Sequence, residues 1–376
     1  MRRASEKHVF ITGASGCLGA ELVPRLLASN GLRATLLVRE TASSERGKAR
    51  FDCASGNIQC VTGDVVLPRL GLGEAQLRRL REEVDEVWHL AAETRFEEVL
   101  RPRIFKVNVE GARNMLRFAA TLPRLRCFHH VSTAFVAGVR NQNDRVFERI
   151  HAKPKAFRNP YEESKYEAER LVRESCLPHI IYRPSIVLAD PALGIDAGQT
   201  VYGVAKMARA AKLLGDREKN GGAGDAKTFR IAANAAAAKN IVPAANVADA
   251  MVGLAAAARP DGGVYHLAHP RPCVMADLMN SVAGLLDLGE CVTVPELDTA
   301  AATAAERMFE RMSRSYAPYM LRGDPAFDTS ITRRALGGWD VPVVDRARLE
   351  DAVHRFFIQT YGEDYAGPRR QTAAVA

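Results

Sequence analysis

A tyrosine and a lysine four residues apart are the side chains of this 376-residue sequence with the most specific chemical potential. Tyr161 and Lys165 stand in the run N-P-Y-E-E-S-K, and residues at this spacing share one face of a helix. A free tyrosine titrates at about pH 10, but an ammonium one helical turn away favours its phenolate. The phenol can then exchange a proton with a carbonyl oxygen while a hydride moves.

A second hydroxyl precedes this pair in the chain. Thr133 comes just after the apolar run 127–131, which predicts a buried strand that ends close to it. We expect Thr133 to hydrogen-bond to the same carbonyl oxygen as Tyr161. Because Tyr-x-x-x-Lys often occurs by chance on a helix surface, the weight of the pair comes from its order. It follows a glycine-rich loop and a threonine at a strand end.

The stretch H-V-F-I-T-G-A-S-G-C-L-G, residues 8–19, is the element that must position the rest. Its apolar start predicts a strand, and the leucine spacing after Cys17 predicts an amphipathic helix. Gly13 would allow the tight turn, Gly16 the approach of a pyrophosphate, and Gly19 close packing of helix on strand. The helix N-terminus would then face the phosphates. The pattern predicts a dinucleotide cofactor, with an ordinary glycine-rich turn as the alternative.

Residues at the ends of the next predicted strands indicate which dinucleotide is bound. Arg39 follows the strand expected at 33–38, where an acidic residue suits the 2′-hydroxyl of NAD and an arginine suits the 2′-phosphate of NADP. The sequence therefore favours NADPH, although Arg39 could instead belong to a basic surface loop. Asp64, after the strand expected at 58–62, is placed to meet the adenine ring. Lys165 is placed to hold the nicotinamide ribose.

Strand-like and helix-like segments alternate through the first half of the chain. The predicted strands are residues 9–11, 33–38, 58–62, 86–91, 127–131 and 179–184, and the predicted helices are 74–84, 94–121 and 159–172. This alternation predicts an α/β fold with a Rossmann-type, doubly wound parallel sheet, whose ligands bind at the carboxyl ends of the strands. Asn108, on an apolar face of the long helix, is expected to tie that helix to the active-site strand.

The alternation fades after about residue 190 and predicts a smaller second region. We expect residues 1–190 to form the NADP-binding domain, with 240–270 returning to it, and 191–239 and 271–366 to form a mostly helical substrate-binding cap. Residues 367–376 are expected to be a disordered tail. Further expectations are loops and a flexible insertion at 215–239, short strands at 241–243 and 263–267, a helix capped by Asn246 that runs to about Ala258, and helices at 275–287, 299–322 and 346–361.

Composition argues against several classes of protein. The hydrophobic share of 47% is ordinary for a packed domain, and no apolar run is long enough to span a membrane. The start, M-R-R-A-S-E-K, leaves no room for a signal peptide, which predicts a cytoplasmic protein. Seven scattered cysteines form no C-x-x-C pair, so neither disulfides nor a metal site are expected. The net charge of +8 is spread out, which favours polyanionic small molecules or an acidic protein over nucleic acid, with a merely solvated basic surface as the alternative.

Several motifs resemble those of the extended short-chain dehydrogenases/reductases over residues 7–270: T-G-A-S-G-C-L-G, H-L-A-A, V-N-V-E-G, V-S-T-A and Y-E-E-S-K. Within that superfamily, E-T-R-F-E-E-V-L-R, H-H-V-S-T-A-F-V-A-G and Y-R-P-S-I-V are similar to fatty acyl-CoA reductases and to the thioester reductase domains of carboxylic acid reductases and peptide synthetases. The resemblance implies that Thr133, Tyr161 and Lys165 are catalytic. Together with the positions argued above, it gives these expected cofactor contacts: Thr12, Gly13, Ser15, Gly16, Cys17, Leu18, Gly19, Arg39, Asp64, Val65, Leu90, Ala91, Ala92, Asn108, Lys165, Pro184 and Ser185.

The activity implied by this resemblance is NADPH-dependent reduction of an acyl thioester, held on CoA or a carrier protein, to an aldehyde. A second hydride would give an alcohol. The helix expected at 299–322 could line an acyl channel, because methionines and aromatic rings make adaptable apolar walls. The residues concerned are Met308, Phe309, Met312, Tyr316, Tyr319 and Met320. The same stripe could instead be the core face of a surface helix.

Other functions stay open at this stage. One is a dehydrogenase, reductase or epimerase acting on a ketone, a sterol-like alcohol or a sugar nucleotide. Ala137 stands where sugar-nucleotide epimerases often have tyrosine, so that branch fits less well. Another is a non-catalytic NADP-binding regulator, against which the intact Thr, Tyr and Lys set argues. The sequence leaves the acyl length, the carrier, the number of electrons and the oligomeric state open, a homodimer included.

Overall fold

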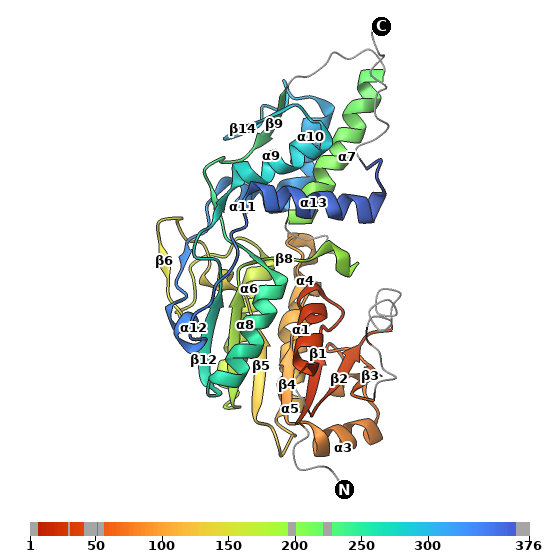
Figure 1. Cartoon of the computed structure of the whole chain (residues 1–376), viewed down its shortest axis with the longest axis vertical. Helices are drawn as coiled ribbons and strands as arrows, with labels where there is room; N and C mark the ends of the chain where they lie inside the picture. The colour runs from red at the N-terminus through yellow and green to blue at the C-terminus, as the bar shows by residue number, and fades with distance from the viewer. Residues whose placement is uncertain are drawn as a thin grey trace.

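A parallel sheet of seven strands forms the base of the molecule in the computed structural model, which describes residues 7–28, 31–40, 51, 56–194, 201–220 and 228–365 (Figure 1). The strands are β1 (Lys7–Thr12), β2 (Leu32–Val38), β3 (Ile58–Thr62), β4 (Glu86–His89), β5 (Cys127–Val131), β7 (His179–Pro184) and β12 (Asp261–Leu267). Their order is β12-β7-β5-β4-β1-β2-β3. The strand order reverses between β1 and β4, the point at which doubly wound sheets bind ligands. The predicted Rossmann-type fold is confirmed.

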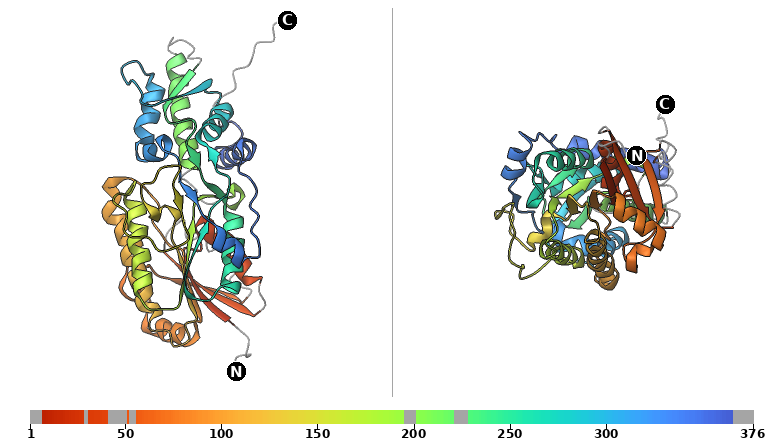
Figure 2. Two further views of the ribbon diagram at one scale, coloured as in Figure 1. Left: turned by 90° about the vertical axis from the view of Figure 1, so that its left-hand side faces the viewer. Right: turned by 90° about the horizontal axis from the view of Figure 1, so that it is seen from below.

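Helices cover both faces of this sheet, because its strands carry apolar side chains on both sides. Every residue of β5 is buried, for example. One face packs against α1 (Cys17–Leu27) and α8 (Ala244–Ala257), and the other against α3 (Glu74–Glu83), α5 (Gly111–Ala119) and α6 (Pro160–Glu174). Figure 2 shows these layers with the sheet between them. The sheet therefore has a buried core on each face and an open carboxyl edge.

The segment expected as one helix at 94–121 is wrong in its start and in its regularity. It begins at Glu98 and continues through α4 (Arg101–Phe105), a π-helical turn at Lys106–Glu110, and α5. The π-helical turn contains Asn108, which is buried and hydrogen-bonded at both side-chain atoms. Single π-helical turns inside helices often occur at functional sites.

The cap stands above the carboxyl edge of the sheet (Figure 1). Its elements are α7 (Val201–Asn220), β9 (Thr228–Ala232), α9 (Met275–Leu286), β14 (Glu290–Val294), α10 (Ala304–Ser313), α11 (Ala317–Leu321) and α13 (Arg346–Tyr361). The strands β9 and β14 pair in parallel, and the helices share one apolar core. The expectation of loops at 215–239 is therefore wrong at both of its described ends, where α7 and β9 lie.

The helix expected at 299–322 divides into α10, a 3₁₀ turn at Arg314–Tyr316, and α11. It begins later than expected because Thr303 caps α10, its hydroxyl accepting a bond from the Glu306 N–H. Asn246 is also not a cap: α8 begins directly after Pro243. The tail expected at 367–376 lies outside the described residues.

Short strand pairs connect the sheet to the cap. They are β8 (Ile186–Leu188) with β11 (Ile241–Pro243), β10 (Ala238–Lys239) with β13 (Cys273–Val274), and β6 (Arg145–Val146) with β15 (Ala326–Phe327). A further helix, α12 (Ser330–Ala335), packs against α8 and β12 rather than against the cap helices. Residues 271–366 thus contribute to both layers, not only to the cap as expected.

Candidate active site

A cavity of about 450 Å³ lies between the carboxyl edge of the sheet and the cap. It is lined by all of the expected catalytic and cofactor residues except Asn108: Thr12, Gly13, Ser15, Gly16, Cys17, Leu18, Gly19, Arg39, Asp64, Val65, Leu90, Ala91, Ala92, Thr133, Tyr161, Lys165, Pro184 and Ser185. The fold therefore brings together residues that are far apart in the sequence.

The glycine-rich turn after β1 is built for close backbone approach. Gly13 has φ +76°, and a Cβ there would lie 2.6 Å from the amide nitrogen of Ala91. A Cβ on Gly19 would lie 2.3 Å from the carbonyl oxygen of Gly13, so only glycine lets α1 sit this close to β1. Gly16 is the N-cap of α1 and carries no side chain into the cavity. This cradle fits the diphosphate of a dinucleotide at a helix N-terminus.

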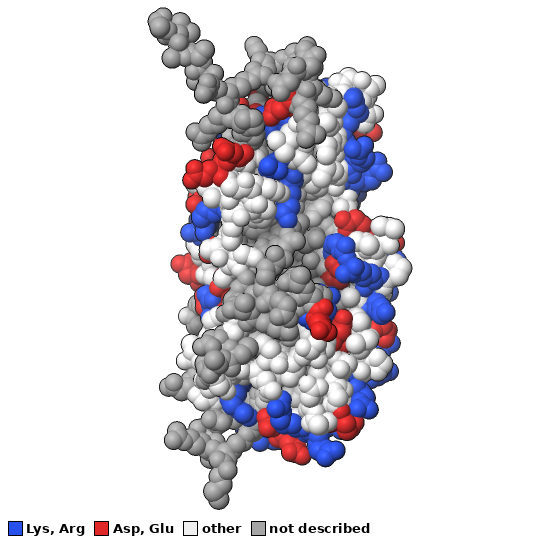
Figure 3. Space-filling model, turned by 90° about the vertical axis from the view of Figure 1, so that its right-hand side faces the viewer, with Lys and Arg blue, Asp and Glu red and all other residues white. Residues whose placement is uncertain are grey.

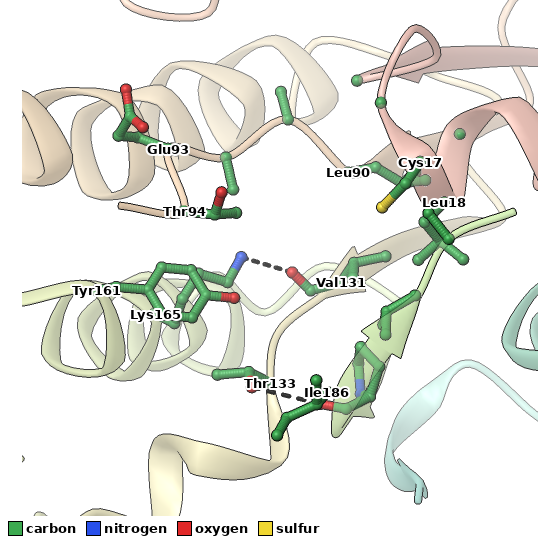
Figure 4. Close-up of a pocket in the computed structure, with 18 of the residues that line it drawn as sticks. Cys17, Leu18, Leu90, Glu93, Thr94, Val131, Thr133, Tyr161, Lys165 and Ile186 are labelled. Atoms are coloured by element: carbon green, nitrogen blue, oxygen red, sulfur yellow. Dashed lines mark hydrogen bonds between the residues drawn. The ribbon is translucent and has the colours of Figure 1, made fainter. Parts of the chain in front are cut away.

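The three expected catalytic side chains come from different elements that meet at the cavity. Asn159 caps α6, its Oδ1 accepting a bond of 3.0 Å from the Glu162 N–H, so that Tyr161 and Lys165 face the cavity from the first turns of the helix. The Lys165 Nζ donates to the carbonyl oxygen of Val131 at 2.6 Å (Figure 4). The Thr133 hydroxyl donates to the carbonyl oxygen of Pro184 at 3.3 Å.

Burial sets the protonation of this group. It raises the pKa of the Tyr161 phenol above its ordinary value, and a hydrogen bond with Thr133 opposes that shift only in part. Burial also lowers the pKa of the Lys165 ammonium to about 8, with Glu169 opposing it. The expectation that Lys165 draws Tyr161 toward the phenolate is not met in this structure, because the ammonium faces Val131 instead. A neutral phenol is the form that can donate a proton.

Two buried contacts that sequence reasoning missed hold the end of β5 in place. The Ser132 hydroxyl donates to Oε2 of Glu169 at 2.8 Å, and Arg183 on β7 binds Oε1 of Glu169 at 2.6 Å. The side chains of Glu169 and Arg183 are each 2% exposed. Because breaking a buried pair leaves an uncompensated charge, this arrangement fixes the strand end that carries Thr133.

Asn108 acts behind the cavity rather than in it. Its Oδ1 accepts from the Glu93 N–H at 2.7 Å, and its Nδ2 donates to the Glu93 carbonyl at 2.9 Å and to the Ser164 hydroxyl at 2.8 Å. The direct cofactor contact expected for Asn108 is thus not what the geometry offers. The residue joins the loop after β4 to α6, next to Lys165.

The stripe expected to line an acyl channel divides into two parts. Tyr316, Tyr319 and Met320 line the cavity. Met308, Phe309 and Met312 do not, because the chain bends after α10: Phe309 packs into the cap core and Met312 faces outward. The sequence missed other lining residues, among them Glu93, Thr94, Phe96, Tyr202 and Lys239. Their signal lies only in the three-dimensional arrangement.

Charge on the surface is mixed rather than concentrated. On the face in Figure 3, basic and acidic side chains are interspersed. Many form pairs, such as Arg25 with Asp249 at 2.6 Å and Arg69 with Glu74 at 2.5 Å. The excess of positive charge therefore marks no docking site on that face.

Comparison with known proteins agrees with this geometry. Residues 11–251 match the model of an NAD-binding family described as male sterility protein. The chain is 27% identical over 233 residues to the fatty acyl-CoA reductase wat of Drosophila melanogaster, covering 50% of this chain and 45% of the fly protein. It spans less than half the length of that relative, and a far smaller share of the peptide and polyketide synthetases that it also matches.

Solved structures confirm the fold. The terminal R domain from the myxalamid PKS-NRPS pathway superposes with a TM-score of 0.72 at 25% identity, covering 94% of this chain and 91% of that one. A UDP-glucuronic acid 4-epimerase from Bacillus cereus in complex with NAD gives 0.65 at 16% identity, covering 96% and 100%. The resemblance to extended short-chain dehydrogenases/reductases, and to acyl-CoA and thioester reductases among them, is confirmed. These matches support a nicotinamide-dependent oxidoreductase.

No helix within the described ranges is long and apolar enough to cross a membrane.

Proposed function

Because the chain belongs to the NAD-binding family described as male sterility protein, we propose that it reduces an acyl thioester to an aldehyde with NADPH. The observation that carries this proposal is the meeting of Tyr161, Thr133 and Lys165 beside the glycine cradle in one cavity. Such a set serves a reaction in which a carbonyl oxygen gains a proton as its carbon gains a hydride. The names of the relatives favour a thioester as the carbonyl compound.

The side chains of this chain would divide the reaction as follows. Tyr161 and Thr133 hydrogen-bond to the thioester oxygen and stabilise the negative charge that develops there. Tyr161, neutral in its buried position, gives its proton to that oxygen. The nicotinamide cofactor, when bound, supplies the hydride. The hemithioacetal that results loses its thiol, the C–S bond breaking as the hydroxyl proton leaves, and gives the aldehyde.

Arg39 supports NADPH as the form of the cofactor. It lies at the carboxyl end of β2 and lines the cavity. A guanidinium binds a phosphate with paired hydrogen bonds. Arg39 therefore suits the 2′-phosphate of NADPH.

The test is to mix the protein with NADPH and acyl thioesters, both acyl-CoAs of several lengths and carrier-bound acyl groups, while following NADPH absorbance and trapping aldehyde. Ketones and sugar nucleotides serve as the competing substrates. Consumption of thioester with aldehyde or alcohol formation supports the proposal. Turnover of ketones or sugar nucleotides alone would move the chain to that class of dehydrogenases.

Tyr161→Phe is the matched control, since it removes one hydroxyl and keeps the ring. It should bind NADPH normally while turnover falls about 10²–10⁴-fold. Near-normal turnover by this variant would show that another group is the acid.

A further inference from the structure

The part of the cap nearest to Tyr161 is fastened to the catalytic helix through one hydroxyl. Tyr319, on α11, donates its phenolic proton to Oε1 of Glu162 at 2.5 Å and accepts from Nδ2 of Asn159 at 2.9 Å. Glu162 and Tyr319 are 157 residues apart in the chain, and all three side chains are buried. Asn159 is also the N-cap of α6, so the Tyr319 hydroxyl is bound to the turn that presents Tyr161.

A buried ionic cluster holds the segment that follows Tyr319. Arg158 pairs with Asp324 at 3.0 Å, their side chains being 1% and 0% exposed. Lys239, at the cavity wall, donates to the carbonyl oxygen of Arg322 at 2.8 Å. The Arg158 guanidinium also lies 4.9 Å from the centre of the Tyr319 ring. Because any loss would leave buried polar groups without partners, the segment cannot yield cheaply.

The ring of Tyr319 forms part of an aromatic wall beside the proton donor. It stacks on Phe96, with ring centres 5.2 Å apart, and Phe96 is 5.2 Å from the ring of Tyr316. The ring of Phe96 is in turn 5.9 Å from that of Tyr161. Phe96, Tyr316 and Tyr319 all line the cavity that contains Tyr161. A thioester whose oxygen meets Tyr161 therefore has its neighbouring carbons within reach of this wall.

We propose that Tyr319 selects and positions the acyl group. Its ring is the wall against which the first carbons of the acyl chain lie, and its hydroxyl fixes that wall to α6. This inference rests on the proposed function and narrows its substrate to straight, apolar acyl chains. A branch next to the carbonyl would have to displace rings that the buried cluster holds in place.

The test compares wild type, Tyr319→Leu and Tyr319→Phe on a straight-chain acyl-CoA and its 2-methyl-branched isomer. Wild type should prefer the straight chain in kcat/KM by about tenfold or more, since one extra carbon in a fixed pocket is discriminated to that extent. Tyr319→Leu should lose most of this preference through a gain on the branched isomer. Tyr319→Phe should keep the preference, because the ring stays, but lose several-fold in kcat. A general loss of folding would lower both substrates equally.

Hydrogen–deuterium exchange of the protein without substrate provides a readout that needs no turnover. Tyr319→Phe should speed exchange in residues 158–165 and 316–324, because the bonds to Glu162 and Asn159 are lost. Tyr361→Phe, an exposed position on α13, should leave both segments unchanged. Unchanged exchange in Tyr319→Phe, or an unchanged substrate ratio in an active Tyr319→Leu, overturns this inference alone. A wild type that reduces no thioester overturns the proposed function instead, and the exchange result still decides whether Tyr319 fastens the wall to α6.

Discussion

Lys165 donates its ammonium hydrogen bond to the backbone carbonyl of Val131 at 2.6 Å, and this contact joins the catalytic helix to the end of the central strand β5. Thr133 follows Val131 by two residues and Tyr161 precedes Lys165 by one helical turn. The bond therefore fixes the two hydroxyls relative to each other. It also commits a buried ammonium to the reaction site, where a negative charge on Tyr161 would develop as the proton leaves.

The activity should fall as pH rises through the pKa of this ammonium. Burial lowers that pKa to about 8, so Lys165 is charged below about pH 8 and neutral above it. A neutral amine cannot stabilise the phenolate that forms on Tyr161. We expect kcat/KM for the thioester to decline above about pH 8 in wild type. Lys165→Arg should be slower but show no such decline, because a guanidinium stays protonated. A wild-type profile that stays flat to about pH 9.5 would contradict this role.

Preference for NADPH should depend on Arg39. We expect wild type to use NADPH better than NADH, measured as the ratio of kcat/KM values. Arg39→Asp should lose most of that preference, because the carboxylate repels the 2′-phosphate and can accept a bond from the 2′-hydroxyl of NADH. Arg33→Asp, on the same strand but not among the cavity-lining residues, is the charge-matched control and should leave the ratio unchanged. Equal use of both cofactors by wild type would refute the prediction.

Local patterns predicted the centre of the site, and long-range contacts set its limits. The glycine turn and the Tyr161–Lys165 pair are short motifs whose spacing fixes their geometry, so sequence alone placed them at one cavity. The contact between Glu162 and Tyr319 has no such signal, since 157 residues separate them. Asn108 was expected at the cofactor because its helix approaches the cavity. Its side chain instead satisfies the backbone of Glu93, a partner that periodicity cannot reveal.

The same limit explains the errors in the cap. The apolar stripe of 299–322 was treated as one helix face, but the turn at Arg314–Tyr316 rotates its two halves to different neighbours. Phe309 consequently meets Phe229 in the cap core, with ring centres 5.9 Å apart, while Tyr319 meets Phe96 at the site. A helical wheel cannot detect such a bend.

Two helical glycines should respond in opposite ways to alanine. A Cβ at Gly19 would lie 2.3 Å from the carbonyl oxygen of Gly13, so Gly19→Ala must push α1 away from the cradle. We expect Gly19→Ala to lower the melting temperature and weaken NADPH binding. Gly284 has no atom within 4 Å of its added Cβ, so Gly284→Ala should raise the free energy of unfolding by about 0.5–1 kcal/mol through helix propensity. Thermal melts with and without NADPH distinguish the two, and a neutral Gly19→Ala would mean that α1 can shift freely.

Glu162 should make the protein less stable as pH rises from about 4.5 to about 7. Burial raises the pKa of its carboxyl to about 7, while in the unfolded chain the carboxyl titrates at about 4.3. Between these values the folded state binds more protons than the unfolded state, so the contribution of Glu162 to stability is full below this window and lost above it. Glu162→Gln keeps an acceptor for Tyr319 but cannot titrate. Urea unfolding at pH 5 and pH 7.5 should therefore show wild type losing on the order of 2–3 kcal/mol more than the variant. Equal losses in the two proteins would show that Glu162 is ionised at its ordinary pH and that the Tyr319 contact is made to a carboxylate throughout.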